Sequence, residues 1–157
     1  MNKINSIPSK KTPNFSTKMS NITSILTDNP LHTEILETAG KLGAKLGLPT
    51  YIVGGFVRDK LMNRPTTDID IMVEGDSIPF SQRLAKELNI KDMIEFDEFK
   101  TVRLYHPEVV IEIASARKES YRDSSRKPLV DIATIEEDLS RRDFTINTIA
   151  ASLSPKD

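Results

Sequence analysis

The segment Thr67–Val73 alternates polar and apolar residues, and this alternation constrains the fold more than any other feature of the 157-residue sequence. The period of two predicts a β-strand with three aliphatic side chains on its buried face. Its other face carries Asp68, Asp70 and Met72. A slip of one residue would bury both acids, so the register is strongly specified. The chain therefore requires a sheet with one buried face and two carboxylates, about 7 Å apart at Cα, on the other.

Helices and further strands are predicted on both sides of this segment. Asn29 and Pro30 are typical of a helix start, and helically spaced apolar residues follow until Gly47 and Pro49. The remaining expected elements are strands at 50–53, 101–105 and 108–114, helices at 56–62, 78–88 and 135–153, and a loop at 117–127. This order predicts an α/β or α+β fold with helices packed against one sheet.

Composition limits the available chemistry. The sequence has no Cys and two His, which excludes disulfides, Cys-ligated metal centres and cysteine nucleophiles and disfavours a multi-His site. Its 22 basic and 23 acidic residues give a net charge of −1, so a polyanion must be met by a local patch. The apolar runs are too short to span a membrane. Carboxylates, hydroxyls, Arg, Lys and backbone amides must carry the function.

The two acids Asp68 and Asp70 have two interpretations. Carboxylates this close repel each other unless a cation lies between them, and Mg²⁺ prefers carboxylate oxygens together with phosphate and water. The alternative is the solvated face of an edge strand. Taken alone, two Asp residues at this spacing in a strand favour the solvated edge-strand face over a metal site.

The glycine pair Gly54 and Gly55 lies between a predicted strand and a predicted helix. Backbone amides there approach a phosphate closely, the helix N-terminus adds partial positive charge, and Arg58 would bind a phosphate oxygen. The alternative is a turn that needs a positive φ, with Arg58 paired to Asp59 or another acid. The turn precedes the two acids by 13 residues, a separation that lets neighbouring strands bring both sites together.

Glu112 lies in the middle of an otherwise aliphatic strand, on its polar side. A lone acid there is costly unless it is satisfied. It would serve as a third carboxylate, either in a two-metal site or as the acceptor of a proton from an attacking hydroxyl. The alternative is a structural ion pair with Arg103 or Arg117, and the sequence supports it about as well as the catalytic role.

The segment Arg141–Asn147 carries the last cluster of polar side chains. In a helix, Asp143 and Asn147 would lie one turn apart and form hydrogen bonds to ribose hydroxyls, while Arg141 or Arg142 would reach a phosphate. The alternative is a charged helix with internal ion pairs, which is the better interpretation of this segment by itself.

Together, three ordered motifs resemble the head domain of class II tRNA nucleotidyltransferases and of the related bacterial poly(A) polymerases. The motifs are Gly54–Asp59, Asp68–Asp70 and Arg141–Asn147, and the resemblance covers about residues 30–153. It implies the polymerase-β-like nucleotidyltransferase fold, a mixed sheet backed by helices. It also implies roles for individual residues: Mg²⁺ binding and catalysis for Asp68 and Asp70, a third catalytic carboxylate for Glu112, and nucleotide binding for Gly54, Gly55, Arg58, Arg141, Arg142, Asp143 and Asn147.

The implied activity is template-independent addition of CCA to the 3′ end of tRNA from CTP and ATP. The RNA 3′-hydroxyl would attack the α-phosphate with Mg²⁺ as cofactor. A poly(A) polymerase, a CC-adding or A-adding enzyme, and an isolated nucleotide-binding head with little turnover are the alternatives.

The sequence also predicts a domain organisation. Residues 1–18 contain four Lys, two Pro and no acid, and we expect a disordered tail there. Residues 19–157 are expected to form the catalytic head. The neck, body and tail regions of the family, with the E-D-x-x-R motif that reads the base, are expected to be missing, and most contacts to tRNA with them. The absence of targeting signals predicts a cytoplasmic protein without membrane contact.

Overall fold

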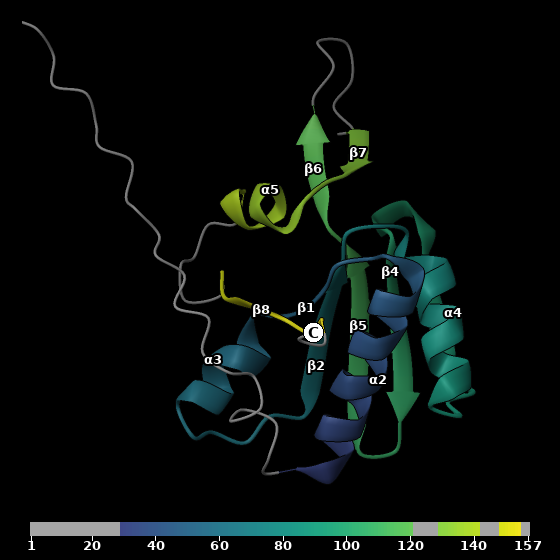
Figure 1. Ribbon diagram of the computed structural model, residues 1–157, viewed down its shortest axis with the longest axis vertical. Coiled ribbons are helices and arrows are strands. Elements are labelled where there is room, and N and C mark those ends of the chain that lie inside the picture. Colours follow the sequence, from purple (N-terminus) through teal and green to yellow (C-terminus); the bar gives the residue numbers. More distant parts are fainter. Residues whose placement is uncertain (1–28, 121–128, 142–147, 155–157) are drawn as a thin grey trace, which may run out of the picture.

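The computed structural model describes residues 29–120, 129–141 and 148–154, and Figure 1 shows their arrangement. Six strands form a mixed sheet in the order β3-β4-β5-β2-β1-β8, and two more form a separate sheet. In chain order the elements are α2 (Pro30–Leu46), β1 (Thr50–Val53), α3 (Gly55–Leu61), β2 (Asp68–Val73), α4 (Ser77–Glu87), β3 (Met93–Phe96), the 3₁₀ helix η1 (Asp97–Phe99), β4 (Thr101–His106), β5 (Val109–Ser115), β6 (Arg117–Ser120), β7 (Leu129–Ile132), α5 (Ile135–Ser140) and β8 (Ala150–Ser152). The predicted mixed sheet backed by helices is confirmed. The tail expected at 1–18 lies outside the described residues.

The first described helix, α2, begins and ends where the sequence predicts. The side-chain oxygen of Asn29 accepts hydrogen bonds from the backbone amides of Leu31 and His32, which lack partners within the helix. Gly47 ends the helix in the left-handed region with φ 66°. With 17 residues α2 is the longest described helix, and none of the described helices is long and apolar enough to cross a membrane.

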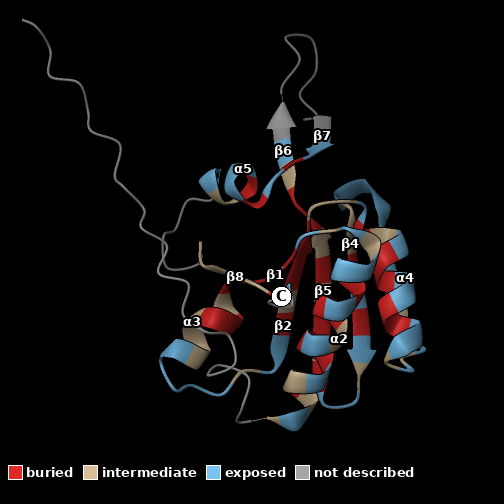
Figure 2. Cartoon of the chain, viewed as in Figure 1, coloured by how far each residue is buried: buried red, intermediate tan, exposed pale blue. Residues whose placement is uncertain are grey.

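Helices α2 and α4 cover one face of the six-stranded sheet (Figure 2). The main core lies between these two helices and the sheet. The predicted buried face of β2 is confirmed, because Ile69, Ile71 and Val73 are each at most 1% exposed. β2 pairs in parallel with β5, and the other neighbouring strands of the sheet are antiparallel. The two central strands thus hold one face firmly against the helices.

Among the described residues, α5 covers one end of the opposite face. A small cluster of Val53, Met72, Ala116 and Ile135 forms there. Met72 therefore shares the face of the two acids and is nevertheless buried. This face of the sheet is therefore covered by α5 at Met72, and it is exposed to solvent at Asp68.

The helix predicted over 135–153 is present at Ile135–Ser140 and wrong at Ala150–Ser152, while residues 142–147 lie outside the described residues. Ala150–Ser152 form β8, in which Ser152 pairs with Tyr51, and the amide of Leu153 donates to the carbonyl of Thr50 over 2.8 Å. The edge of β1 offers these residues backbone partners, and this pairing overrides the helix propensity of the two alanines.

The loop predicted over 117–127 is wrong at its start. Arg117–Ser120 form β6, which pairs antiparallel with β7. The residues of β6 are polar and show no periodicity, so they gave no local signal for a strand. The strand forms because it pairs with Leu129–Ile132 further along the chain. β3 and η1 were also not predicted.

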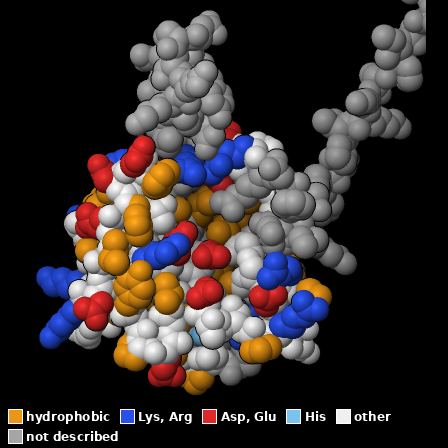
Figure 3. Space-filling model, turned by 180° about the vertical axis from the view of Figure 1, so that it is seen from behind, with side chains coloured by type: hydrophobic (Ala, Val, Ile, Leu, Met, Phe, Trp, Pro, Cys, Tyr) orange, Lys and Arg blue, Asp and Glu red, His pale blue; other side chains and the backbone are white. Residues whose placement is uncertain are grey.

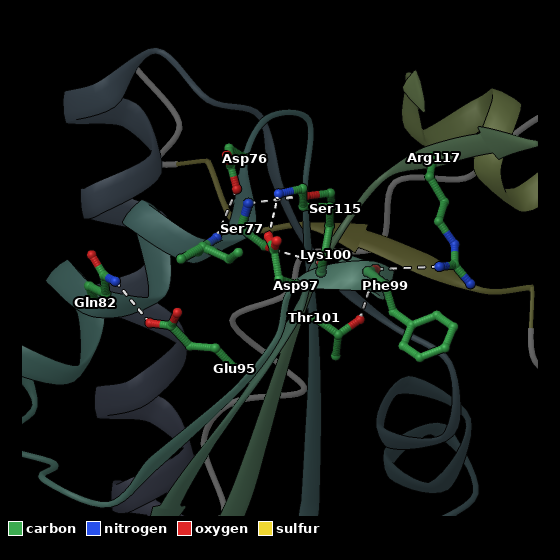
Figure 4. Close-up of polar contacts among 11 residues, drawn as sticks. Asp76, Ser77, Gln82, Glu95, Asp97, Phe99, Lys100, Thr101, Ser115 and Arg117 are labelled. Carbon is green, nitrogen blue, oxygen red and sulfur yellow. Dashed lines mark hydrogen bonds and ion pairs between the residues drawn. The ribbon is translucent and has the colours of Figure 1, made fainter. Parts of the chain in front are cut away.

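A set of hydrogen bonds joins the ends of α4, β4 and β5 (Figure 4). The hydroxyl of Ser77 donates to the carbonyl of Lys100 over 2.6 Å, and the amide of Ser77 donates to the hydroxyl of Ser115 over 3.0 Å. Arg117 donates through its guanidinium to the carbonyl of Phe99 over 3.3 Å. These bonds fix the point at which β5 continues into β6.

Close packing of α2 against the end of the sheet gives a prediction about stability. A Cβ at Gly40 would overlap the carbonyl oxygen of Leu153. We expect Gly40→Ala to lower the free energy of unfolding by about 1–3 kcal/mol, because overpacking outweighs the gain in helix propensity. Urea denaturation measures this change. The exposed neighbour Lys41→Ala should change it by less than about 0.5 kcal/mol. A Gly40→Ala protein as stable as the wild type would contradict the close contact.

Candidate active site

Three carboxylates lie together on the open face of the sheet. Asp70 is directly opposite Glu112 in the parallel β2–β5 pair, and Asp68 is opposite Val110. Together with two side chains of β4, these four residues line one pocket of about 360 Å³. The structure thus brings all three predicted catalytic side chains to one place. Figure 3 views the molecule from the side opposite to Figure 1 and shows this face, with acidic side chains grouped near its middle.

Arg103 and Tyr105 of β4 complete the lining of this pocket. The sequence analysis named Arg103 only as an alternative ion-pair partner of Glu112 and gave Tyr105 no role. The register of β4 and β5 puts Arg103 opposite Glu112 and Tyr105 opposite Val110. Directly paired residues share one face of a sheet. The alternation of residues 101–105 puts both side chains on one face of the strand, but only the pairing of β4 with β5 brings that face to the pocket.

Glu112 forms an ion pair with Arg103, in which Nε and Oε2 are 2.7 Å apart. The hydrogen bond to this carboxylate raises the pKa of Arg103. Both side chains are more than a third exposed, so the pair contributes little to stability. The ion-pair alternative for Glu112 is thus present in the structure, and its role as a third carboxylate stays a prediction.

The donor set of the pocket fits a divalent metal that binds together with a nucleotide. Within the described ranges, no three His, Cys, Asp or Glu side chains are grouped so that they would hold a metal ion by themselves. Asp68 and Asp70 supply two carboxylates on one strand face, while Glu112 is engaged by Arg103. Mg²⁺ at phosphoryl-transfer sites typically takes one or two carboxylates and completes its shell with phosphate and water.

The glycine turn lies beside the two acids. Because Ile52 pairs with Ile71, the antiparallel register brings Gly54 next to the part of β2 that holds Asp70. Gly54 has φ 68° and ψ −134°, which only glycine adopts readily, and its amide donates to the carbonyl of Ile149 over 2.8 Å. The turn therefore does require a positive φ, and the Gly54 amide is committed to the chain leading into β8.

Arg58 lies over this turn, held by its neighbour. Its Nε donates to one carboxylate oxygen of Asp59 over 2.9 Å and its terminal nitrogen to the other over 3.1 Å. These hydrogen bonds raise the pKa of Arg58 and lower that of Asp59. A Cβ at Gly55 would lie 3.4 Å from the guanidinium, so the glycine leaves this group room. The predicted pairing of Arg58 with Asp59 is present.

Arg141 ends α5 and forms an ion pair with Asp138, with the guanidinium nitrogen 2.7 Å from the carboxylate oxygen. Asp138 is fully buried and also accepts from the amide of Arg117 over 3.2 Å. Arg141 thus joins α5 to β6, and its contact with phosphate stays a prediction. The remaining predicted nucleotide-binding residues lie outside the described residues; they are Arg142, Asp143 and Asn147.

Glu74 holds the other end of α5 against the sheet. Its carboxylate accepts from the amide of Ile135 over 2.8 Å and from the hydroxyl of Tyr51 over 3.3 Å. Burial, and then the charge of Glu74, raise the pKa of Tyr51 to about 12. The first turn of α5 is thereby tied to β1 and to the end of β2.

This contact predicts how stability depends on alkaline pH. Folded Tyr51 keeps its proton up to about pH 12, whereas in the unfolded chain a tyrosine loses it near pH 10. The contribution of Tyr51 is therefore complete below pH 10 and is lost as the pH rises to about 12. Urea unfolding across this range should show a steeper loss of stability in the wild type than in Tyr51→Phe.

Tyr105→Phe is the matched control, since Tyr105 lies on the open face and is 37% exposed. Tyr105→Phe should lose stability with rising pH as steeply as the wild type does. Equal slopes for the wild type and Tyr51→Phe would show that folding does not raise the pKa of the Tyr51 hydroxyl.

Comparison with known proteins gives consistent results. Residues 50–157 match the family described as the poly A polymerase head domain. The A-adding tRNA nucleotidyltransferase of Geobacter sulfurreducens is 40% identical over 121 residues, and that of Halalkalibacterium halodurans is 38% identical over 125 residues. These alignments cover 76% and 79% of this chain, but only 14% and 29% of the relatives.

Two solved structures are similar in fold. The apo form II of a CCA-adding enzyme superposes with a TM-score of 0.76 at 38% identity, covering 88% of this chain and 33% of that one. A tRNA nucleotidyltransferase complexed with a primer tRNA and an incoming ATP analogue superposes with a TM-score of 0.62 at 36% identity, covering 76% and 32%. The polymerase-β-like head expected from the motifs is confirmed.

Proposed function

The chain belongs to the poly A polymerase head-domain family, and we propose on this basis that it is the catalytic head of a template-independent tRNA nucleotidyltransferase. The observation that carries the proposal is the pocket in which Asp68, Asp70 and Glu112 meet on the open face of the sheet. Buried aliphatic residues on the opposite face hold this arrangement in place.

The substrates proposed are the 3′ end of tRNA and the nucleotides CTP and ATP, with CCA as the product. Addition of A alone is the second candidate, and the names of the two curated relatives favour it. The head motifs themselves do not distinguish these products, nor a poly(A) polymerase.

The carboxylates of Asp68 and Asp70 would hold Mg²⁺. When bound, Mg²⁺ polarises phosphate oxygens and neutralises negative charge during an in-line displacement. In the reaction, the 3′-oxygen of the RNA bonds to the α-phosphorus while the bond to the pyrophosphate oxygen breaks. Glu112, which accepts a hydrogen bond from Arg103, takes up the proton of the attacking hydroxyl as the general base.

The other predicted residues would position the nucleotide. Two hydrogen bonds to Asp59 orient the guanidinium of Arg58 beside the glycine turn. A triphosphate would bind there, next to Asp70. Contacts to the ribose 2′-hydroxyl would favour ribonucleotides over deoxyribonucleotides. The residues assigned to the nucleotide are Gly54, Gly55, Arg58, Arg141, Arg142, Asp143 and Asn147.

We assign the head to residues 19–157 and base choice, with most of the contact to tRNA, to regions beyond it. The chain spans only 14% and 29% of the length of the two relatives. With a net charge of −1, it has no overall positive field for RNA. A cytoplasmic site of action stays a prediction.

The double variant Asp68→Asn with Asp70→Asn tests this assignment. We expect nucleotide addition to fall by about 10³-fold or more, because several kcal/mol of charge stabilisation are lost. The affinity for Mg-ATP, measured by equilibrium titration, should fall about tenfold, which corresponds to about 1.4 kcal/mol. Equal Mg-ATP binding by the wild type and the variant would exclude the metal assignment.

The matched control is Glu34→Gln with Glu37→Gln. Both acids are exposed on α2, which covers the opposite face of the sheet. This variant changes the net charge equally and should leave Mg-ATP binding unchanged. The product is identified by offering labelled CTP or ATP to tRNA that lacks CCA or only the final A. Long A tails would contradict both tRNA proposals.

A further inference from the structure

We propose that the open face of β3 and β4 binds the single-stranded 3′ end of the RNA and that its bases stack on Tyr105 and Phe96. The surface, here the β3–β4 platform, consists of Ile94, Phe96, Arg103 and Tyr105. The proposal rests on the proposed function and identifies the part of the head that holds the attacking strand.

The platform is continuous with the carboxylate pocket. The strand registers place Ile94, Arg103, Glu112 and Asp70 in one row across β3, β4, β5 and β2. Tyr105 belongs to the neighbouring row, in which it lies opposite Val110, and Val110 in turn lies opposite Asp68. Arg103 and Tyr105 themselves line the pocket. An RNA end that reaches the carboxylates from this side must therefore cross the platform.

The platform exposes large apolar side chains where the sheet carries no described helix. Ile94 is 48%, Phe96 36% and Tyr105 37% exposed, whereas Val102 and Leu104 on the opposite face of β4 are fully buried. In Figure 3 a group of hydrophobic side chains lies beside the acidic ones, with a basic side chain between them. Contiguous exposed apolar surface of this kind marks a binding site more often than chance exposure does.

The chemistry of the platform suits single-stranded nucleic acid. Aromatic faces accept stacked bases of any sequence, and a nearby cation meets the phosphates. The Arg103 guanidinium lies 5.6 Å from the centre of the Phe96 ring. It therefore offers a positive charge between an aromatic face and the carboxylates.

The geometry of the reaction selects this side of the sheet. The sheet order places β1 on one side of β2 and β5, β4 and β3 on the other. The glycine turn and Arg58 follow β1, so the triphosphate belongs to that side. In an in-line displacement the attacking and leaving oxygens lie on opposite sides of the phosphorus. The RNA then approaches over β5 and β4, and β3, about 14 Å from β2, lies within reach of a few stacked nucleotides.

A protein partner fits this surface less well than RNA. A second copy or another domain packed on the platform would cover the Arg103–Glu112 ion pair and close the pocket beside it. Desolvating these charges is costly. RNA brings phosphates to Arg103 and leaves the carboxylates open to the nucleotide.

The experiment uses a tRNA acceptor-stem RNA whose 3′-terminal base is 2-aminopurine, titrated with the protein. Stacking on an aromatic ring quenches the fluorescence of this base. We expect the wild type and Tyr105→Phe to quench it, and Tyr105→Leu and Phe96→Leu to lose the quenching. Leucine keeps the apolar character but removes the π-face. The same two leucine variants should weaken RNA binding about tenfold, and Phe96→Leu, whose side chain does not line the carboxylate pocket, should leave Mg-ATP binding unchanged.

Leu61→Ala is the matched control, because Leu61 is 60% exposed at the end of α3, away from the platform. It should behave like the wild type. Circular dichroism checks the folding of each variant. If Tyr105→Leu does not fold, Phe96→Leu and Arg103→Gln decide, and both should weaken RNA binding.

Quenching by folded Tyr105→Leu equal to that of the wild type would overturn the proposal. So would platform variants that change the sedimentation of the protein but not its RNA binding, since this would identify a protein interface. Failure of the proposed function has a different signature, namely Mg-ATP binding that does not depend on Asp68 and Asp70.

Discussion

The parallel pairing of β2 and β5 is the constraint on which the site depends. It places Asp70 directly beside Glu112, and the aliphatic residues that alternate with them are buried against α2 and α4. A register slip in either strand would move carboxylates into the core, where an unpaired charge is very costly. The same hydrophobic contacts that stabilise the sheet therefore fix the spacing of the acidic side chains.

The open face is shaped by what covers its ends. Helix α5 closes one end through Glu74, which binds its first turn, and through buried Asp138, which joins it to β6. The glycine turn and α3 border the site beyond β1, and the β3–β4 platform borders it beyond β5. The carboxylates thus lie between a side suited to phosphate and a side suited to bases.

Local patterns in the sequence predicted the elements with a clear period or cap. The helix from Pro30, the strand at Asp68 and the convergence of Asp68, Asp70 and Glu112 were all predicted and are present. The strand β8 was missed because backbone pairing with β1 overrides the helix propensity of its alanines. Tyr105 was missed, and Arg103 was named only as an ion-pair partner of Glu112, because their place at the site depends on which strand β4 pairs with, which alternation alone does not reveal.

The central claim is that the acid pair holds a metal and a nucleotide at one place on this face. A crystal structure with Mg²⁺ and a non-hydrolysable ATP analogue tests it most directly. The account predicts a metal ion bound by the carboxylates of Asp68 and Asp70, with the triphosphate lying toward Gly55 and Arg58. A nucleotide bound elsewhere, with neither carboxylate within coordination distance of the metal, would contradict it.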